Sequence, residues 1–193
     1  MYGELEKRGI PVVIMEPLRG GSLAKLPNRI VDELKERMPS ESVASWAFRF
    51  AGTPENVLTV LSGMTYMEHL RDNLRTYSPL VPLTEDDMEF LEKVAESLSK
   101  YPLVPCTGCQ YCMPCPYGID IPGNFSHYNK CVNEGYTVSE PDGDSDECTE
   151  EMKAYRRARR AYLVSYDRSI EKIRQANRCI GCGQCMSHCP QDI

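Results

Sequence analysis

Residues 179–190 read Cys-Ile-Gly-Cys-Gly-Gln-Cys-Met-Ser-His-Cys-Pro, so four cysteines are separated by two, two and three residues and are followed by proline. Residues 106–116 read Cys-Thr-Gly-Cys-Gln-Tyr-Cys-Met-Pro-Cys-Pro, with two residues in every gap. These two windows hold eight of the ten cysteines in the chain. Thiolates are soft ligands, and this clustering in a chain with three histidines indicates a metal or redox group rather than disulfides.

The second window, 179–189, has the cysteine spacing of bacterial ferredoxins. In that pattern three closely spaced thiolates hold one 4Fe-4S cluster, and the fourth, before proline, ligates the other cluster. Gly181 and Gly183 permit the backbone to wrap closely around such a group. The spacing predicts a first-window cluster on Cys106, Cys109, Cys112 and Cys189, and a second-window cluster on Cys179, Cys182, Cys185 and Cys115.

Structural zinc is the alternative for these cysteines, because zinc sites also use Cys-x-x-Cys pairs. Four cysteines at such close spacing would crowd one tetrahedral centre, so two runs that both end in Cys-Pro favour iron–sulfur clusters. Cys131 and Cys148 lie outside both windows, and we expect them to be spare thiols. His69, His127 and His188 are expected to be structural or exposed rather than catalytic.

The composition bounds the class of protein. Of 193 residues, 41% are hydrophobic and 26% are charged, as in a globular chain. A net charge of −6 argues against nucleic-acid binding, which needs a basic surface. No apolar run is long enough to span a bilayer, and residues 1–20 do not have the pattern of a signal peptide. We therefore expect a cytoplasmic protein with no membrane partner.

The first half of the chain alternates strand and helix patterns. Residues 10–15 and 57–61 are apolar, β-branched runs that predict two strands, the first buried on both faces, with helices between and after them in a parallel α/β arrangement. Thr84 and Asp87 predict a capping box for a helix over 85–99. Periodicity stops near residue 101, which predicts domains at 1–101 and 102–193, with a helical insertion at about 124–177.

Several of these segments resemble one protein family. Residues 9–21 (Gly-Ile-Pro-Val-Val-Ile-Met-Glu-Pro-Leu-Arg-Gly-Gly) and 43–74 are similar to the last two strands and following segments of aldo/keto reductases. Residues 106–122 and 179–193 resemble the ferredoxin domain that one bacterial and archaeal branch of that family carries. The resemblance implies the last two βα units of an incomplete (β/α)8 barrel, followed by a helix-rich, two-cluster ferredoxin-like domain.

The resemblance also implies nucleotide contacts. Leu18 corresponds to a position facing the pyrophosphate of the cofactor, Gly63 and Met64 to the start of the 2′-phosphate site, and Asp72 and Asn73 to positions near the adenine. Many NADPH-preferring members have lysine and arginine where Gly63 and His69 stand here, so NADP and NAD both stay open, and only for a full-length protein. The family's catalytic Asp, Tyr, Lys and His have no counterpart in this chain, so no catalytic residue is predicted.

Two functions follow from these readings. The first is the C-terminal fragment of an iron–sulfur oxidoreductase of the aldo/keto reductase family, whose clusters relay electrons and which cannot reduce carbonyls by itself. It predicts six more βα units encoded upstream of Met1, because a whole barrel needs about 250 residues.

The alternative is a stand-alone two-cluster electron carrier with a docking module at residues 1–100. A scaffold with purely structural clusters is a third possibility. The redox partner is unknown, and exposed barrel edges predict self-association.

Overall fold

The computed structural model describes residues 2–136 and 149–193. It divides the chain into two compact units, Met1–Lys100 and Tyr101–Ile193. Cys148, one of the two expected spare thiols, lies outside the described residues. Within the described residues, no helix is both long and apolar enough to cross a membrane.

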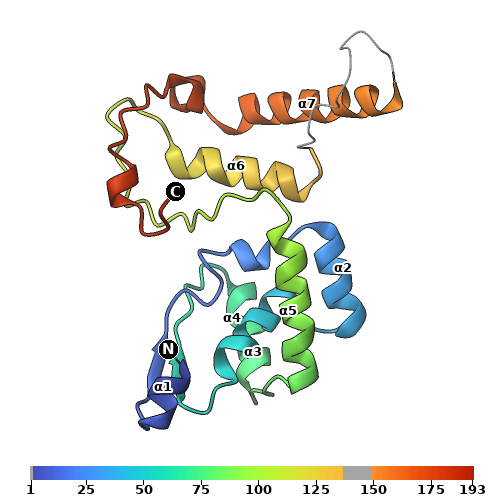
Figure 1. Cartoon of the computed structure of the whole chain (residues 1–193), viewed down its shortest axis with the longest axis vertical. Coiled ribbons are helices and arrows are strands. Elements are labelled where there is room, and N and C mark those ends of the chain that lie inside the picture. The colour runs from blue at the N-terminus through green and yellow to red at the C-terminus, as the bar shows by residue number, and fades with distance from the viewer. Residues whose placement is uncertain (1, 137–148) are drawn as a thin grey trace. The chain divides into compact units, whose positions relative to one another are not determined.

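The first unit is built on two parallel strands, β1 (Val12–Ile14) and β2 (Val57–Val60), with Val12 opposite Val57 (Figure 1). The parallel pairing agrees with the expected strand–helix–strand order. The helices of this unit are α1 (Tyr2–Lys7), α2 (Asn28–Arg37), α3 (Val43–Gly52), α4 (Met67–Tyr77) and α5 (Glu85–Ser99), with a 3-10 turn at Ser22–Ala24. α3 packs against β2 and α4, and α2 packs against α5.

The core of the first unit lies among its helices rather than on the sheet. Ile30, Leu34, Trp46 and Phe48 are almost completely buried, and the Trp46 ring lies 5.5 Å from the ring of Phe90 on α5. Burial of these side chains removes apolar surface from water and is the main stabilising contribution to this unit. The helices therefore hold the unit together, and the two strands lie at its surface.

The expectation of a strand buried on both faces is wrong. Val13 on β1 is 49% exposed and Leu58 on β2 is 72% exposed. A parallel strand is buried on both faces only when further strands and helices cover it, and the described part of the chain provides no third strand beside these two. Phe50 on α3 is also half exposed. The unit thus has an open apolar surface around its sheet.

The start of α5 follows the sequence signal closely. The Thr84 side chain accepts a hydrogen bond from the Asp87 backbone N–H (3.2 Å), and the Asp87 carboxylate accepts one from the Thr84 backbone N–H (3.1 Å). Arg37 at the end of α2 donates to the same carboxylate at 2.9 Å. Burial alone would raise the pKa of Asp87, but the hydrogen bonds from Thr84 and Arg37 together lower it below the usual value.

The second unit pairs two helices, α6 (Ile121–Asn133) and α7 (Glu150–Ser169), which lie side by side (Figure 1). Cys131, Val132 and Met152 are buried in this unit. Within the helical insertion expected at about 124–177, α7 ends at Ser169, and the chain continues in three short 3-10 turns. These turns are Lys172–Arg174, Ala176–Arg178 and Met186–His188. Both cysteine windows are therefore loops, one before α6 and one after α7.

Candidate metal centre

The two cysteine windows fold into the same local backbone. Gly108 (φ 68°) and Gln110 (φ 64°) are left-handed in the first window, and Gly181 (φ 71°) and Gly183 (φ 73°) are left-handed at the equivalent places in the second. Each loop then closes with the same turn. The N–H after the third cysteine donates to the residue after the second cysteine, at 2.9 Å in the first window and 3.1 Å in the second. Alternating left-handed residues turn the loop inward, which glycine permits at little cost.

The Cys-Pro ends of the windows also match. The N–H of Gly118 (φ 76°) donates to the carbonyl of Cys115 at 2.9 Å, and the N–H of Asp192 (φ 53°) donates to the carbonyl of Cys189 at 3.4 Å. In both windows the chain thus turns back immediately after the fourth cysteine. The shared backbone is what two equivalent ligand loops around two similar groups would require.

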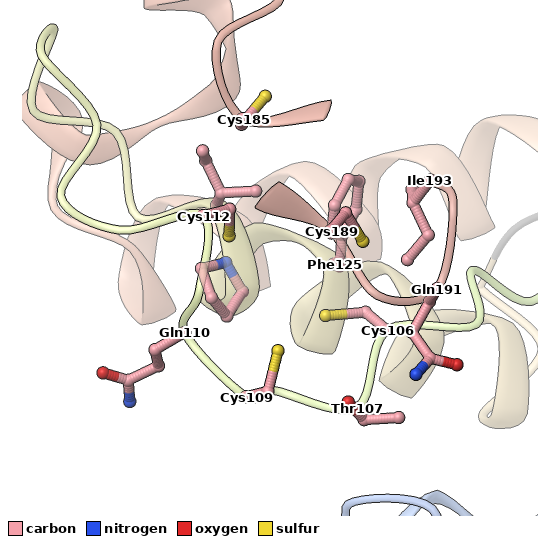
Figure 2. A pocket seen from close by; sticks show the side chains of 12 residues that line it. Cys106, Thr107, Cys109, Gln110, Cys112, Phe125, Cys185, Cys189, Gln191 and Ile193 are labelled. Atoms are coloured by element: carbon pink, nitrogen blue, oxygen red, sulfur yellow. The ribbon is translucent and has the colours of Figure 1, made fainter. Parts of the chain in front are cut away.

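Cysteines from both windows line one pocket, together with apolar side chains that include Phe125, Pro122 and Ile193. The pocket cysteines are Cys106, Cys109, Cys112, Cys185 and Cys189. Figure 2 shows the sulfur atoms of four of them around a common space, while the sulfur of Cys185 points away. Those four are Cys106, Cys109, Cys112 and Cys189, the set expected for the first-window cluster.

The other expected set is more open. Cys179 and Cys182 are exposed, and Cys115 and Cys185 are partly buried. Of these four, only Cys185 borders the pocket of Figure 2. Across residues 2–136 and 149–193, no three side chains of His, Cys, Asp or Glu are gathered tightly enough to hold a single metal ion.

The surroundings of Cys112 disfavour its thiolate form. Burial raises the pKa of Cys112, and the nearby thiolates of Cys106, Cys109 and Cys185 raise it further, against the lowering effect of a backbone N–H. Several thiolates in one apolar pocket repel each other unless a cationic group lies between them. Four soft donors in partly apolar surroundings fit the ligand chemistry of an iron–sulfur cluster.

The residues expected to contact a nucleotide lie after the two strands and on α4. Leu18 is half-buried in the loop after β1, and Gly63 and Met64 are exposed after β2. The Asn73 side chain donates to the Ser62 hydroxyl at 3.0 Å, which brings α4 beside the loop carrying Gly63. The Arg75 guanidinium forms an ion pair with the Asp72 carboxylate at 2.8 Å.

Residues 105–193 match the 4Fe-4S dicluster domain family. The C-terminal part of the chain is thus ferredoxin-like, and its cysteines support iron–sulfur clusters and electron transfer. The match does not extend over the first unit. Among curated proteins and solved structures, nothing matches the chain. The aldo/keto reductase resemblance of the first unit therefore stays a prediction.

The spare thiol Cys131 belongs to a buried polar cluster between α6 and α7. His127 Nε2 lies 3.3 Å from Cys131 Sγ and 3.4 Å from the Ser165 hydroxyl, and the rings of Tyr162 and Tyr166 pack against the imidazole. Burial lowers the pKa of His127 and raises that of Cys131, so both groups are neutral near pH 7. This neutral cluster packs the two helices together and lies outside the pocket of Figure 2.

Sequence reasoning missed the polar residues that hold the windows in place. Three side chains form hydrogen bonds with backbone groups near the windows: Asn124 and Asn129 on α6, and Tyr166 on α7. Their partners lie 10 to 52 residues away along the chain. Asparagine has no periodic signature of its own, so these contacts had no local sequence signal. The one available clue was three asparagines within the 13-residue helix α6, two of which make these contacts.

Proposed function

We propose that this chain is the C-terminal part of an iron–sulfur oxidoreductase of the aldo/keto reductase family, carrying two 4Fe-4S clusters in its second unit. The observation that most supports the clusters is that both cysteine windows have the same backbone conformation, and that four thiols point toward one pocket (Figure 2). The dicluster match over residues 105–193 supports the two clusters. The aldo/keto reductase part of the proposal rests on the resemblance of residues 9–21 and 43–74. When bound, such clusters accept and donate single electrons.

The residues of the chain have defined tasks in this proposal. Cys106, Cys109, Cys112 and Cys189 hold the first-window cluster, and Cys179, Cys182, Cys185 and Cys115 hold the second-window cluster. Phe125, Pro122 and Ile193 line the first site and limit the access of water to it. Cys179 and Cys182 are exposed, so the second site is the one nearer to solvent. Electrons would then enter or leave through the second-window cluster.

Reversible reduction tests the electron-transfer part of the proposal. Anaerobically prepared protein should lose its visible iron–sulfur absorbance when dithionite is added and recover it on reoxidation, with electron paramagnetic resonance signals in the reduced state. Iron and sulfide that do not respond to dithionite would instead indicate clusters with a structural role. The potential is set by burial and by hydrogen bonds to the sulfurs.

The first unit contributes a nucleotide site only in a complete barrel. We propose that Leu18, Gly63, Met64, Asp72 and Asn73 contact NADP or NAD there, with substrate chemistry supplied by residues outside this chain. The 193-residue chain alone should then show no reduction of an aldehyde by NADPH. The coding sequence upstream of Met1 should encode six further βα units, and turnover by this chain alone would contradict the assignment.

The second candidate is a stand-alone electron carrier, and one observation favours it: residues 101–193 form a compact unit that contains all eight window cysteines. In that case residues 1–100 serve as a docking module. A reading frame that begins at Met1 would favour this carrier over the barrel fragment. Both candidates are consistent with a cytoplasmic setting, which keeps thiols reduced.

We also propose that the chain self-associates through its first unit. Large apolar side chains are exposed on and after the strands, among them Met15 (73%), Leu58 (72%) and Tyr66 (65%). Two short parallel strands also leave unpaired backbone groups at both edges of the sheet. Apolar surface and open edges together favour contact with a second copy of this unit, or with further barrel strands.

A further inference from the structure

Side chains of helix α6 form hydrogen bonds with the backbone just before each cysteine window. Its Asn129 side chain bonds to both backbone groups of Val104: Oδ1 accepts from the Val104 N–H at 2.8 Å, and Nδ2 donates to the Val104 carbonyl at 2.7 Å. The same carbonyl accepts a hydrogen bond from the N–H of Cys106 at 2.8 Å. One asparagine is therefore linked through one residue to the first cysteine of the first window.

Asn124 has the same relation to the second window. Its Oδ1 accepts from the N–H of Ala176 at 3.0 Å, and its Nδ2 donates to the carbonyl of Arg174 at 3.0 Å. The carbonyl of Ala176 in turn accepts from the N–H of Cys179 at 3.0 Å. Asn124 is again linked through one residue to the first cysteine of its window.

A side chain of α7 adds hydrogen bonds to the contact between Asn124 and the backbone before the second window. The Tyr166 hydroxyl donates to Asn124 Oδ1 and accepts from the Ala176 N–H at 2.8 Å. Asn124 is itself buried, so its hydrogen bonds are shielded from competing water. Removing the amide would leave the Arg174 carbonyl with fewer donors and the Tyr166 hydroxyl without its acceptor, an effect that is costly in a buried place.

Both asparagines sit on one rigid element. Five residues of α-helix separate them along the axis by about 7.5 Å. The two contact points therefore have a fixed separation, set by the geometry of α6 rather than by the loops. The loops contain left-handed turns but no regular ladder of hydrogen bonds that would fix this separation themselves.

We propose that Asn124 and Asn129 are positioning residues: each sets the first cysteine of one window, and α6 thereby fixes the two cluster sites relative to each other. The inference rests on the proposed function, because it concerns the ligand loops of the two clusters. Asn129 acts on the first-window cluster and Asn124 on the second-window cluster. Outer partners of metal ligands act in this way by orienting the ligands that touch the metal.

The test measures iron release from each cluster separately in the 193-residue chain. A Cys182→Ala background retains the first-window cluster, and a Cys109→Ala background retains the second-window cluster. Asn129→Ala and Asn124→Ala are placed in both backgrounds, and release to a ferrous chelator is followed after anaerobic reconstitution. Lys130→Ala is the matched control, because Lys130 is exposed on the same helix and pairs only weakly with Glu134 at 3.8 Å.

Asn129→Ala should speed release from the first-window cluster about 10-fold and change the second-window cluster by less than about twofold, and Asn124→Ala should do the reverse. Equal acceleration of both clusters, or none beyond Lys130→Ala, would overturn the inference, because a general loss of stability is not selective. If an alanine variant does not fold, Asn129→Asp and Asn124→Asp keep the acceptor, lose the donor and must show the same selectivity. A wild-type chain that binds no iron would instead refute the proposed function itself.

Discussion

At the scale of single residues, the buried thiol of Cys131 differs from the eight thiols proposed as cluster ligands. Cys131 is 1% exposed, hydrogen-bonded within a neutral cluster, and outside both windows. Cys131→Ser should therefore leave the iron content unchanged. It should lower the free energy of unfolding by about 1–2 kcal/mol, because a hydroxyl replaces a buried thiol. Cys109→Ser is the matched variant and should lose about half of the iron. Iron loss in Cys131→Ser would show that this thiol is a ligand.

Asp87 gives the first unit a pH-dependent contribution to stability. Its folded pKa lies below the unfolded value, so the contribution is complete above about pH 4 and is lost as the pH falls through the folded pKa. Asp87→Asn removes it at every pH. The difference in unfolding free energy between wild type and Asp87→Asn should shrink as the pH falls below about 4. A difference that stays constant with pH would contradict this account of Asp87.

The fluorescence of Trp46 reports this unfolding directly. It is the single tryptophan of the chain, it is 3% exposed, and it packs against Phe90 of α5, the helix whose capping box includes Asp87. The measurement therefore follows the first unit without a signal from tryptophan in the second.

At the scale of elements, the two windows should exchange their fourth ligands. Cys189 lies in the second window, but its sulfur faces the pocket of the first (Figure 2). Cys189→Ala should therefore remove the first-window cluster and preserve the paramagnetic signal of the second, whereas Cys182→Ala should do the opposite. The two variants come from the same loop. If both remove the same cluster, each window binds its own cluster and the exchange is wrong.

Local signals in the sequence predicted elements well where the partners are also local. Thr84 and Asp87 form the expected capping box, and the Ser42 side chain accepts from the Ser45 N–H at the start of α3. The left-handed places at Gly181 and Gly183 follow from glycine's freedom. Gln110 and Asp192 take the same conformation without being glycine, and only comparison of the two windows would have indicated them.

Sequence patterns did not predict the structure where residues distant along the chain determine it. The apolar neighbours of Val13 predict a strand residue buried on both faces. Its burial, however, depends on further strands, which are absent from the described residues. Asn124 and Asn129 went unnoticed because a buried amide bonded to a remote backbone has no pattern in the sequence. The ferredoxin-like nature of the C-terminal part was thus predictable from the spacing of its cysteines, but the residues that position the loops were not.

At the scale of the whole molecule, the exposed surface of the first unit should drive association. Leu58→Glu on β2 should raise the dissociation constant of the self-associated form about 10-fold, because a carboxylate would be desolvated in the contact. Leu163→Glu on α7, also an exposed leucine, is the control and should have little effect. Sedimentation velocity over a range of concentrations measures both. A wild-type chain that stays monomeric throughout would refute the association.

The central claim is that eight cysteines hold two 4Fe-4S clusters in residues 101–193. Analysis of iron and acid-labile sulfide in the anaerobically prepared 193-residue chain tests it most directly. The account predicts about eight iron atoms and about eight sulfide ions per chain. Zinc without sulfide, or iron and sulfide at about half these amounts, would contradict it.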